Sequence, residues 1–197
     1  MNIQNILELH YITHIGNLPS IYKYGILSHK QTGGLSHVSV ASPDVQERRA
    51  KKIIPGGLPL HAYVNLYFDA RNPMMYVLQA KHANLCILQI DPAVMNLPGA
   101  IVSDRNASSD YARFFPCPSG LKHLDATMVF ATSWKHPNNQ FEEWEHKSIK
   151  CAEVLVPDKV VPKYLLSAYV SCNEALNFFQ KTNVSVSATV KPYLFFR

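Results

Sequence analysis

The residue that most clearly indicates chemistry is Glu153, which stands directly before the apolar residues 154–156. Burying a carboxylate is costly unless it has partners, so an acid at the mouth of a buried strand is often retained for function. The alternative is an edge residue that faces water, where most glutamates lie. The sequence therefore makes Glu153 a candidate functional residue.

A pair of arginines, Arg48 and Arg49, begins a cationic run that continues to Lys51 and Lys52. Guanidinium groups match phosphate oxygens in a bidentate manner, so this run could clamp a phosphate. The structural alternative is a solvated helix face. The residues by themselves leave these two interpretations equally open.

Two histidines, a tyrosine and a threonine lie within residues 10–14. On a strand, Tyr11 and Thr13 share one face, and the residues between and beside them share the other. This segment is either a strand with a polar edge or a platform of hydrogen-bond donors for a heterocycle or a ribose.

Aromatic and basic residues of the second half of the chain could bind nucleic acid. Trp134 and Trp144 are either core residues or exposed surfaces on which unpaired bases stack. Residues 111–115 form a similar aromatic and cationic group, in which the adjacent phenylalanines favour the core. Three lysines could contact phosphates: Lys135, Lys147 and Lys150.

Composition is that of a globular chain of 197 residues, which predicts one domain over residues 1–197. Apolar residues make up 47% and charged residues only 17%, which argues against disorder. The net charge of +5 suits a polyanionic partner without proving one.

Several protein classes are excluded by absent patterns. The four cysteines are far apart and form no CxxC pair, so we expect reduced thiols in the cytoplasm and no metal site. No apolar run approaches the roughly 18 residues of a membrane helix, and the first ten residues lack the basic start of a secretory signal. No Walker A loop, GxGxxG fingerprint or GxSxG elbow is present, which argues against a nucleotide triphosphatase, a Rossmann dehydrogenase and an α/β-hydrolase.

Helices and strands that must position these residues alternate along the chain, with helices early and strands later, which predicts the α+β class. Helical spacing and caps predict helices over residues 18–24, 43–52, 73–79 and 173–181, with Asn17 and Ser171 as caps of the first and last, and a helical turn over 110–114. Runs of β-formers predict strands over residues 6–14, 63–68, 85–90, 101–104, 153–156, 165–170 and 184–190. Residues 116–139 are a long loop, and long ordered loops are often functional.

Segments in the same order over nearly the whole chain resemble the DarT-type ADP-ribosyltransferases, toxin enzymes that modify single-stranded DNA with NAD. They are HYITHIGNLPSI (residues 10–21), VQERRAKK (45–52), VNLYFDARNPMMYV (64–77), DRNASSDYARFF (104–115) and AEVLVP (152–157). Two departures are plain: Tyr11 stands where the family commonly has histidine, and Asn65 where it has proline. The resemblance implies an ADP-ribosyltransferase-like fold with a central split antiparallel sheet and peripheral helices.

The resemblance also implies a role for particular residues. Arg49 and Glu153 match the catalytic arginine and glutamate, with Arg48 one residue away from the former. The NAD site would include Tyr11, Ile12, Thr13, Ser20, Leu27, Arg49, Tyr67, Arg71 and Met74. Residues 106–149 would present the nucleic acid, with Trp134 and Lys150 as contacts. No metal is implied, we expect a monomer, and a macrodomain hydrolase would be the neutralising antitoxin.

The physical chemistry agrees with this assignment. Breaking the bond between nicotinamide and ribose develops positive charge on the ribose, which a carboxylate such as that of Glu153 stabilises. The alternatives are transfer to RNA or to a protein side chain, or a catalytically silent module that binds nucleic acid or NAD. An unpaired base avoids the cost of unstacking, so a single-stranded substrate is predicted.

Overall fold

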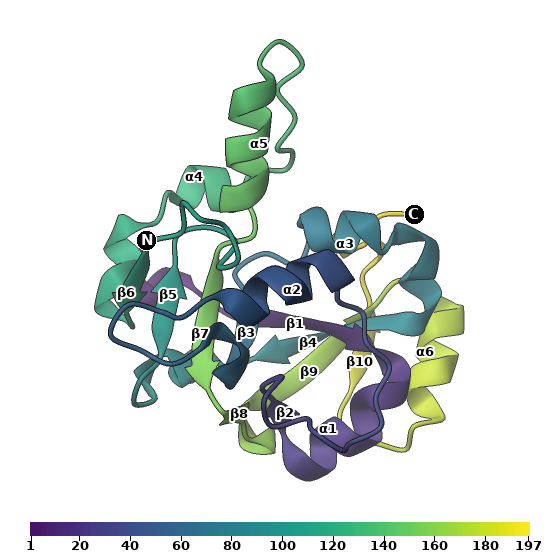
Figure 1. The fold of residues 1–197 in the computed structure, drawn as a ribbon. Helices are drawn as coiled ribbons and strands as arrows, with labels where there is room; N and C mark the ends of the chain where they lie inside the picture. The colour runs from purple at the N-terminus through teal and green to yellow at the C-terminus, as the bar shows by residue number, and fades with distance from the viewer.

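The computed structural model describes residues Met1–Arg197, and its central feature is an eight-stranded sheet with the order β10-β9-β4-β1-β3-β7-β5-β6 (Figure 1). The strands are β1 (Leu9–His14), β3 (Tyr63–Tyr67), β4 (Leu85–Ile90), β5 (Ile101–Ser103), β6 (Phe114–Pro116), β7 (Glu153–Pro157), β9 (Leu165–Val170) and β10 (Ala188–Val190). All neighbours are antiparallel except β9 and β10. A small second sheet pairs β2 (Ile26–Leu27) with β8 (Lys159–Val160).

Six α-helices surround the sheet: α1 (Leu18–Tyr24), α2 (Pro43–Lys51), α3 (Pro73–Val77), α4 (Ala126–Val129), α5 (Gln140–Ile149) and α6 (Asn173–Gln180). Short 3-10 helices occupy Ile3–Asn5, Ile15–Asn17, Leu60–Ala62, Gln79–Asn84, Pro92–Asn96, Ser119–His123, Pro162–Tyr164 and Pro192–Leu194. Figure 1 shows α5 and the loop before it projecting from the body of the molecule. None of the helices combines the length and apolarity needed to cross a membrane.

The sheet is split between β1 and β3. These neighbours share a single register pair, His10 with Tyr67, whereas β1 is paired with β4 along its whole length and β3 with β7 along its whole length. Beyond that pair, the two strands separate toward the end of β1 and the start of β3. The α+β class and the split antiparallel sheet expected from the sequence are therefore confirmed.

Apolar side chains hold the two halves of the sheet in place from both faces. β4 lies between β1 and β9, and its continuous apolar run is fully buried, as is usual for a strand covered on both faces. The largest core cluster joins one face of the sheet to α1 and α6, through residues such as Leu18 and Phe179. A second cluster joins the other face to α3 and the C-terminal segment, through Met75 and Phe195.

Three local predictions are wrong, each for a structural reason. Residues 110–114 form a turn that leads into β6, because Ser103 and its neighbours in β5 provide a strand partner there. The last strand is confined to Ala188–Val190, since β9 pairs with only those residues. The N-cap position of α6 is Cys172, because the Ser171 hydroxyl donates to the carbonyl of His82 instead.

Candidate active site

A buried ion pair lies beside the split in the sheet. Glu153 begins β7, where it is paired with Tyr67 of β3 on one side and Ser103 of β5 on the other. Nη1 of Arg49 donates to both carboxylate oxygens of Glu153 at 3.2 Å, and the backbone N–H of Ala107 donates to Oε1 at 2.8 Å. Arg49 is 6% exposed and Glu153 1% exposed. The carboxylate is thus held in a fixed orientation away from bulk water.

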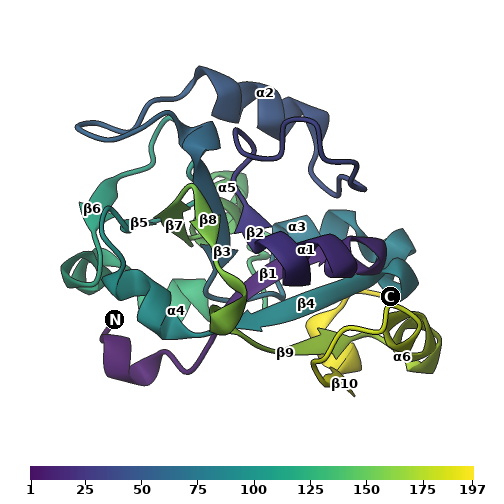
Figure 2. The same cartoon turned by 90° about the horizontal axis from the view of Figure 1, so that it is seen from below.

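The local sequence explains why Arg49 reaches this position. Pro43 begins α2, Asp44 lies in its first turn and basic residues fill its last turn, an order that complements the helix dipole. Successive residues of a helix point about 100° apart, so only one arginine of the pair can face the sheet. Arg49 is the buried one, and Arg48 is exposed. Figures 1 and 2 together place α2 over β1 and β3.

The split between β1 and β3 opens into a cavity of about 250 Å³. Its wall is formed by β1, β3, α2, the segment of residues 37–41 and the 3-10 helix that precedes β3. Arg49 is the only permanently charged side chain in this wall, and no carboxylate lines it. The cavity is therefore suited to an anionic ligand.

Two phenols of the cavity remain neutral. Burial raises the pKa of Tyr11 to about 12. Burial, with the adjacent negative charge of Glu153, raises the pKa of Tyr67 well above its usual value. The Tyr67 hydroxyl donates to Sδ of Met74 at 3.2 Å. Both rings can therefore serve as hydrogen-bonding and stacking surfaces without contributing charge.

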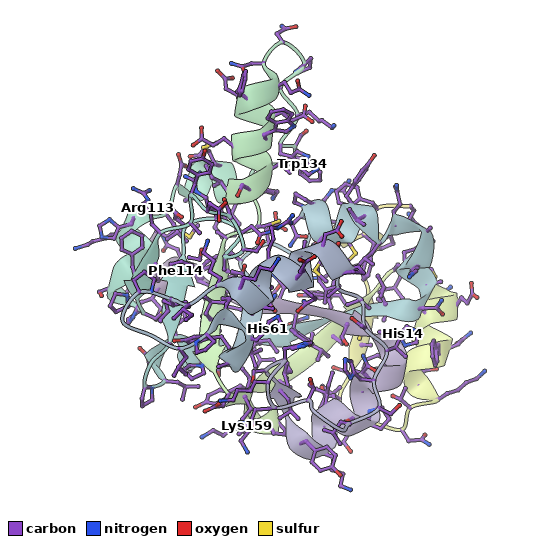
Figure 3. The ribbon with its side chains drawn as sticks, in the orientation of Figure 1. His14, His61, Arg113, Phe114, Trp134 and Lys159 are labelled. Atoms are coloured by element: carbon purple, nitrogen blue, oxygen red, sulfur yellow. The ribbon has the colours of Figure 1, made fainter.

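Two imidazoles also meet in the cavity wall. The rings of His29 and His61 have centroids 4.1 Å apart, and Nε2 of His61 donates to Oε1 of Gln46 at 3.0 Å. Burial, together with His29 and Arg49, lowers the pKa of His61, so its imidazole is neutral at neutral pH. Figure 3 shows His61 beneath α2.

A family model described as "ssDNA thymidine ADP-ribosyltransferase, DarT" matches residues 10–196. The chain belongs to the DarT family. A DNA ADP-ribosyl transferase-DNA ADP-ribosyl glycohydrolase fusion protein from Thermosipho africanus is 31% identical over 196 residues, which cover 96% of this chain and 49% of that protein. A DNA ADP-ribosyl transferase from Thermus sp. (strain 2.9) is 32% identical over 142 residues, covering 66% of this chain and 67% of the relative.

Solved structures of DarT proteins share this fold. Thermosipho africanus DarTG in complex with ADP-ribose superimposes with a TM-score of 0.82 at 26% identity, covering 96% of this chain and 51% of the other. Thermus sp. 2.9 DarT in complex with NAD+ superimposes with a TM-score of 0.80 at 24% identity, covering 98% of both chains. The chain thus spans about half the length of the Thermosipho fusion protein.

The cavity of this DarT-family chain gathers most of the residues that the sequence suggested for NAD. Tyr11, Ile12, Thr13, Leu27, Arg49, Tyr67 and Met74 all line it. Glu153 does not line the cavity itself, but it is hydrogen-bonded to Arg49, which does. Ser20 does not line the cavity, because α1 carries it away from the wall.

Arg71 is also outside the cavity. Its Nη1 donates to the carbonyls of Tyr193 and Phe195 at 2.7 and 2.9 Å, and its guanidinium lies 3.9 Å from the ring centre of Phe196. Arg71 thus does not line the cavity in this structure, and its place in the NAD site stays a prediction. The side chain instead holds the C-terminal segment against the turn that precedes α3.

The prediction that Trp134 is an exposed stacking surface is also wrong. Trp134 is 5% exposed, and its ring packs edge-on against Tyr76 and Phe196 with centroids 6.0 and 5.8 Å away. Figure 3 shows it on the side of α5 that faces α3. On α5, the aromatic side chains of Phe141 and Trp144 are exposed, and their rings contact each other edge-to-face with centroids 5.7 Å apart.

Lys150 cannot contact phosphates in this structure, contrary to the prediction. It is 1% exposed, its Nζ is paired with the carboxylate of Asp69, and it donates to the carbonyl of Val129 at 3.0 Å. The whole Lys150 side chain is buried, and its buried ammonium group therefore requires these partners. Lys150 follows α5, and it therefore connects this helix to Val129 at the end of α4 and to Asp69 just after β3.

We expect Lys150→Met to lower the free energy of unfolding by about 3 kcal/mol, because it leaves the Asp69 carboxylate without its partner. Urea unfolding measures this loss. The exposed Lys147 is the matched control, and Lys147→Met should change stability by less than about 0.5 kcal/mol. If Lys150→Met left stability unchanged and weakened nucleic-acid binding, Lys150 would be a substrate contact and not a structural residue.

Several cavity residues were missed by sequence reasoning. Gln46 lies three residues before Arg49, and helical spacing puts both on one face of α2, so this residue was identifiable. His61 and Asn17 are isolated polar residues without a recognisable pattern. Residues 37–41 have no periodicity at all, and only the structure shows that they cross the cavity.

Proposed function

We propose that this chain transfers ADP-ribose from NAD to a base of single-stranded DNA, with release of nicotinamide. The observation that carries the proposal is the buried pair of Arg49 and Glu153 at the cavity of a DarT-family chain. Support comes from relatives named DNA ADP-ribosyl transferases, and from a solved Thermus structure in complex with ADP-ribosylated ssDNA. The family description names thymidine, so we expect thymidine as the acceptor.

The cavity wall fits NAD as the co-substrate. A pyrophosphate carries negative charge, and the wall presents one guanidinium, neutral hydrogen-bonding groups and no carboxylate. The phenols of Tyr11 and Tyr67 provide flat apolar surfaces with a polar edge for the heterocycles and ribose. Bound NAD supplies the ADP-ribosyl group, whose bond to nicotinamide breaks in the reaction.

Glu153 acts by electrostatics in this proposal. Its carboxylate, which is hydrogen-bonded to Arg49 beside the cavity, stabilises the positive charge that develops on the ribose. The Ala107 N–H and the flanking strands keep the carboxylate in one orientation, so little reorganisation is needed during the reaction. Burial at 1% exposure makes this charge more effective than it is in water.

Arg49 has two tasks that its position allows. It balances the buried charge of Glu153, which would otherwise be expensive to maintain. It also lines the cavity, where its remaining N–H groups can orient a phosphate or the acceptor base. Its high pKa makes simple proton abstraction by this side chain unfavourable.

Labelled NAD tests the proposal directly. The protein is incubated with one oligonucleotide alone, with the same oligonucleotide annealed to its complement, and with the RNA version. We expect the single strand to be labelled about a hundredfold faster than the duplex, because an unpaired base avoids an unstacking cost of a few kcal/mol. Labelling should fall as salt rises, because the net charge of +5 provides weak electrostatic binding.

Each other outcome has a definite meaning. Equal labelling of single strand and duplex would defeat the strand preference. Preferential labelling of the RNA version would show that the substrate is RNA and not DNA. Labelling of protein alone, or of nothing, would overturn the proposed function. The Glu153→Gln protein, prepared in the same way, is the control for labelling by contaminants of the preparation.

The proposed activity also implies a counteracting partner and a compartment. In the Thermosipho relative, the transferase is fused to a DNA ADP-ribosyl glycohydrolase. We therefore propose that a macrodomain-type glycohydrolase that removes ADP-ribose from DNA acts as the antitoxin of this chain. The four cysteines are unpaired, which fits the cytoplasm, where thiols stay reduced.

A further inference from the structure

The segment of residues 37–41, here called the strap, crosses the cavity, and all of its residues line it. Val40 is partly buried against the core cluster that contains Ile12 and Tyr67, but residues 37–39 are exposed, and Val38 is 49% exposed. Two hydrogen bonds of the strap are local: the Ala41 N–H donates to Oγ of Ser39, and the His37 ring donates to the Leu35 carbonyl. The exposed residues 37–39 are therefore fixed by a partner outside the strap.

One side chain supplies that attachment. Oδ1 of Asn17 accepts from the Val38 N–H at 2.9 Å, and Nδ2 of Asn17 donates to the Val38 carbonyl at 2.9 Å. The amide thus pairs with the backbone as a neighbouring strand would. Its second Nδ2 hydrogen goes to Oγ1 of Thr13, on β1, at 3.1 Å. The Asn17 side chain therefore hydrogen-bonds both to the strap and to β1.

The position of Asn17 in the sequence makes this use unusual. It occupies the N-cap position of α1, where asparagine normally accepts a hydrogen bond from the first turn, yet it makes no side-chain cap bond. Its polar atoms are committed to Val38 and Thr13 instead. The amide therefore serves the cavity rather than the helix.

The bond to Thr13 has a further consequence. A hydroxyl has one donor hydrogen and two acceptor lone pairs, and here one lone pair is used by Asn17. Thr13 is 3% exposed and lines the cavity, and its own hydrogen has no acceptor in the protein. That hydrogen is left to donate to an acceptor atom of a ligand.

We propose that Asn17 is a positioning residue that holds the strap over the cavity and orients the Thr13 hydroxyl, and so sets the affinity for the dinucleotide. The proposal rests on the proposed function, since it takes NAD as the ligand. Because neither the strap nor Thr13 hydrogen-bonds to Arg49 or Glu153, we expect their contacts to contribute equally to the ground state and the transition state. Losing them should raise KM and leave kcat nearly unchanged.

The discriminating variants are Asn17→Ala and Asn17→Asp. Aspartate is as good an N-cap as asparagine, but it has no hydrogen to donate to the Val38 carbonyl or to Thr13. If Asn17 holds the strap, both variants should raise the KM for NAD about tenfold, or about 1.4 kcal/mol, with kcat within about twofold of the wild type. If Asn17 merely supports α1, Asn17→Asp should behave as the wild type, which would overturn the proposal.

Limited proteolysis gives a second readout that does not depend on transfer activity. A nonspecific protease should cut within the strap at least several times faster in both variants than in the wild type, with cleavage sites located by mass spectrometry. Added NAD should slow cleavage of the wild type. Equal strap cleavage in all three proteins would defeat the role of Asn17, whereas absence of any NAD effect on the wild type would defeat the proposed function alone.

Discussion

Replacing Glu153 with glutamine should lower the rate of ADP-ribose transfer by about a hundred- to a thousandfold, which is the typical cost of losing one transition-state electrostatic contact. Glutamine keeps the shape of the side chain and can still accept hydrogen bonds from Arg49 and Ala107, but it carries no charge. Binding of NAD should change little, because Glu153 does not line the cavity wall. The measurement is single-turnover labelling of a single-stranded oligonucleotide at saturating NAD.

The choice of glutamine follows from the buried ion pair. From sequence alone, Glu153→Ala is expected to leave folding intact. The structure corrects that expectation, because alanine leaves the buried Arg49 with neither a counter-charge nor a hydrogen-bond acceptor, at a cost of about 3–5 kcal/mol. Glu145, whose side chain is 58% exposed, is the matched control, and Glu145→Gln should retain transfer. Near wild-type transfer by a folded Glu153→Gln protein would remove Glu153 from the catalytic machinery.

Local patterns predicted the frame of the molecule well. The apolar run of β4 and the Pro43 start of α2 are short-range signals, and the structure has both elements where the sequence indicated them. The apolar run after Glu153 also predicted the start of β7, but it left open whether Glu153 is buried, which the structure shows. In each case the energetics are decided within a few residues, so spacing and propensity were sufficient.

Long-range partners explain the failures. A lysine and a tryptophan near polar loops are typical of surface residues, but Lys150 meets Asp69, and Trp134 meets Tyr76 and Phe196. These partners are some 60 to 80 positions away in sequence. No local pattern encodes which residues the fold brings together at such separations. The reciprocal pairing of Asn17 with Val38 was invisible for the same reason, because its sequence signal is that of a helix cap.

Arg49→Ala should reduce transfer by at least about a hundredfold, whereas Arg48→Ala should leave kcat within about twofold of the wild type. The two residues are adjacent, but α2 buries only Arg49 against Glu153, and Arg48 faces solvent. Arg48→Ala removes one exposed positive charge, so its expected effect is a modestly weaker, salt-dependent binding of DNA. The measurements are kcat and the apparent affinity for the oligonucleotide at two salt concentrations.

Arg49→Lys separates loss of charge from loss of geometry. Lysine retains a positive charge near Glu153 and so protects folding, but its ammonium cannot reproduce the guanidinium contact with both carboxylate oxygens and the cavity at once. We therefore expect Arg49→Lys to unfold at a urea concentration near that of the wild type and to transfer ADP-ribose far more slowly. If Arg49→Lys retains full activity, the arginine supplies only charge. If Arg48→Ala instead abolishes transfer while Arg49→Ala retains it, the catalytic arginine is displaced by one residue, and the buried pair is structural.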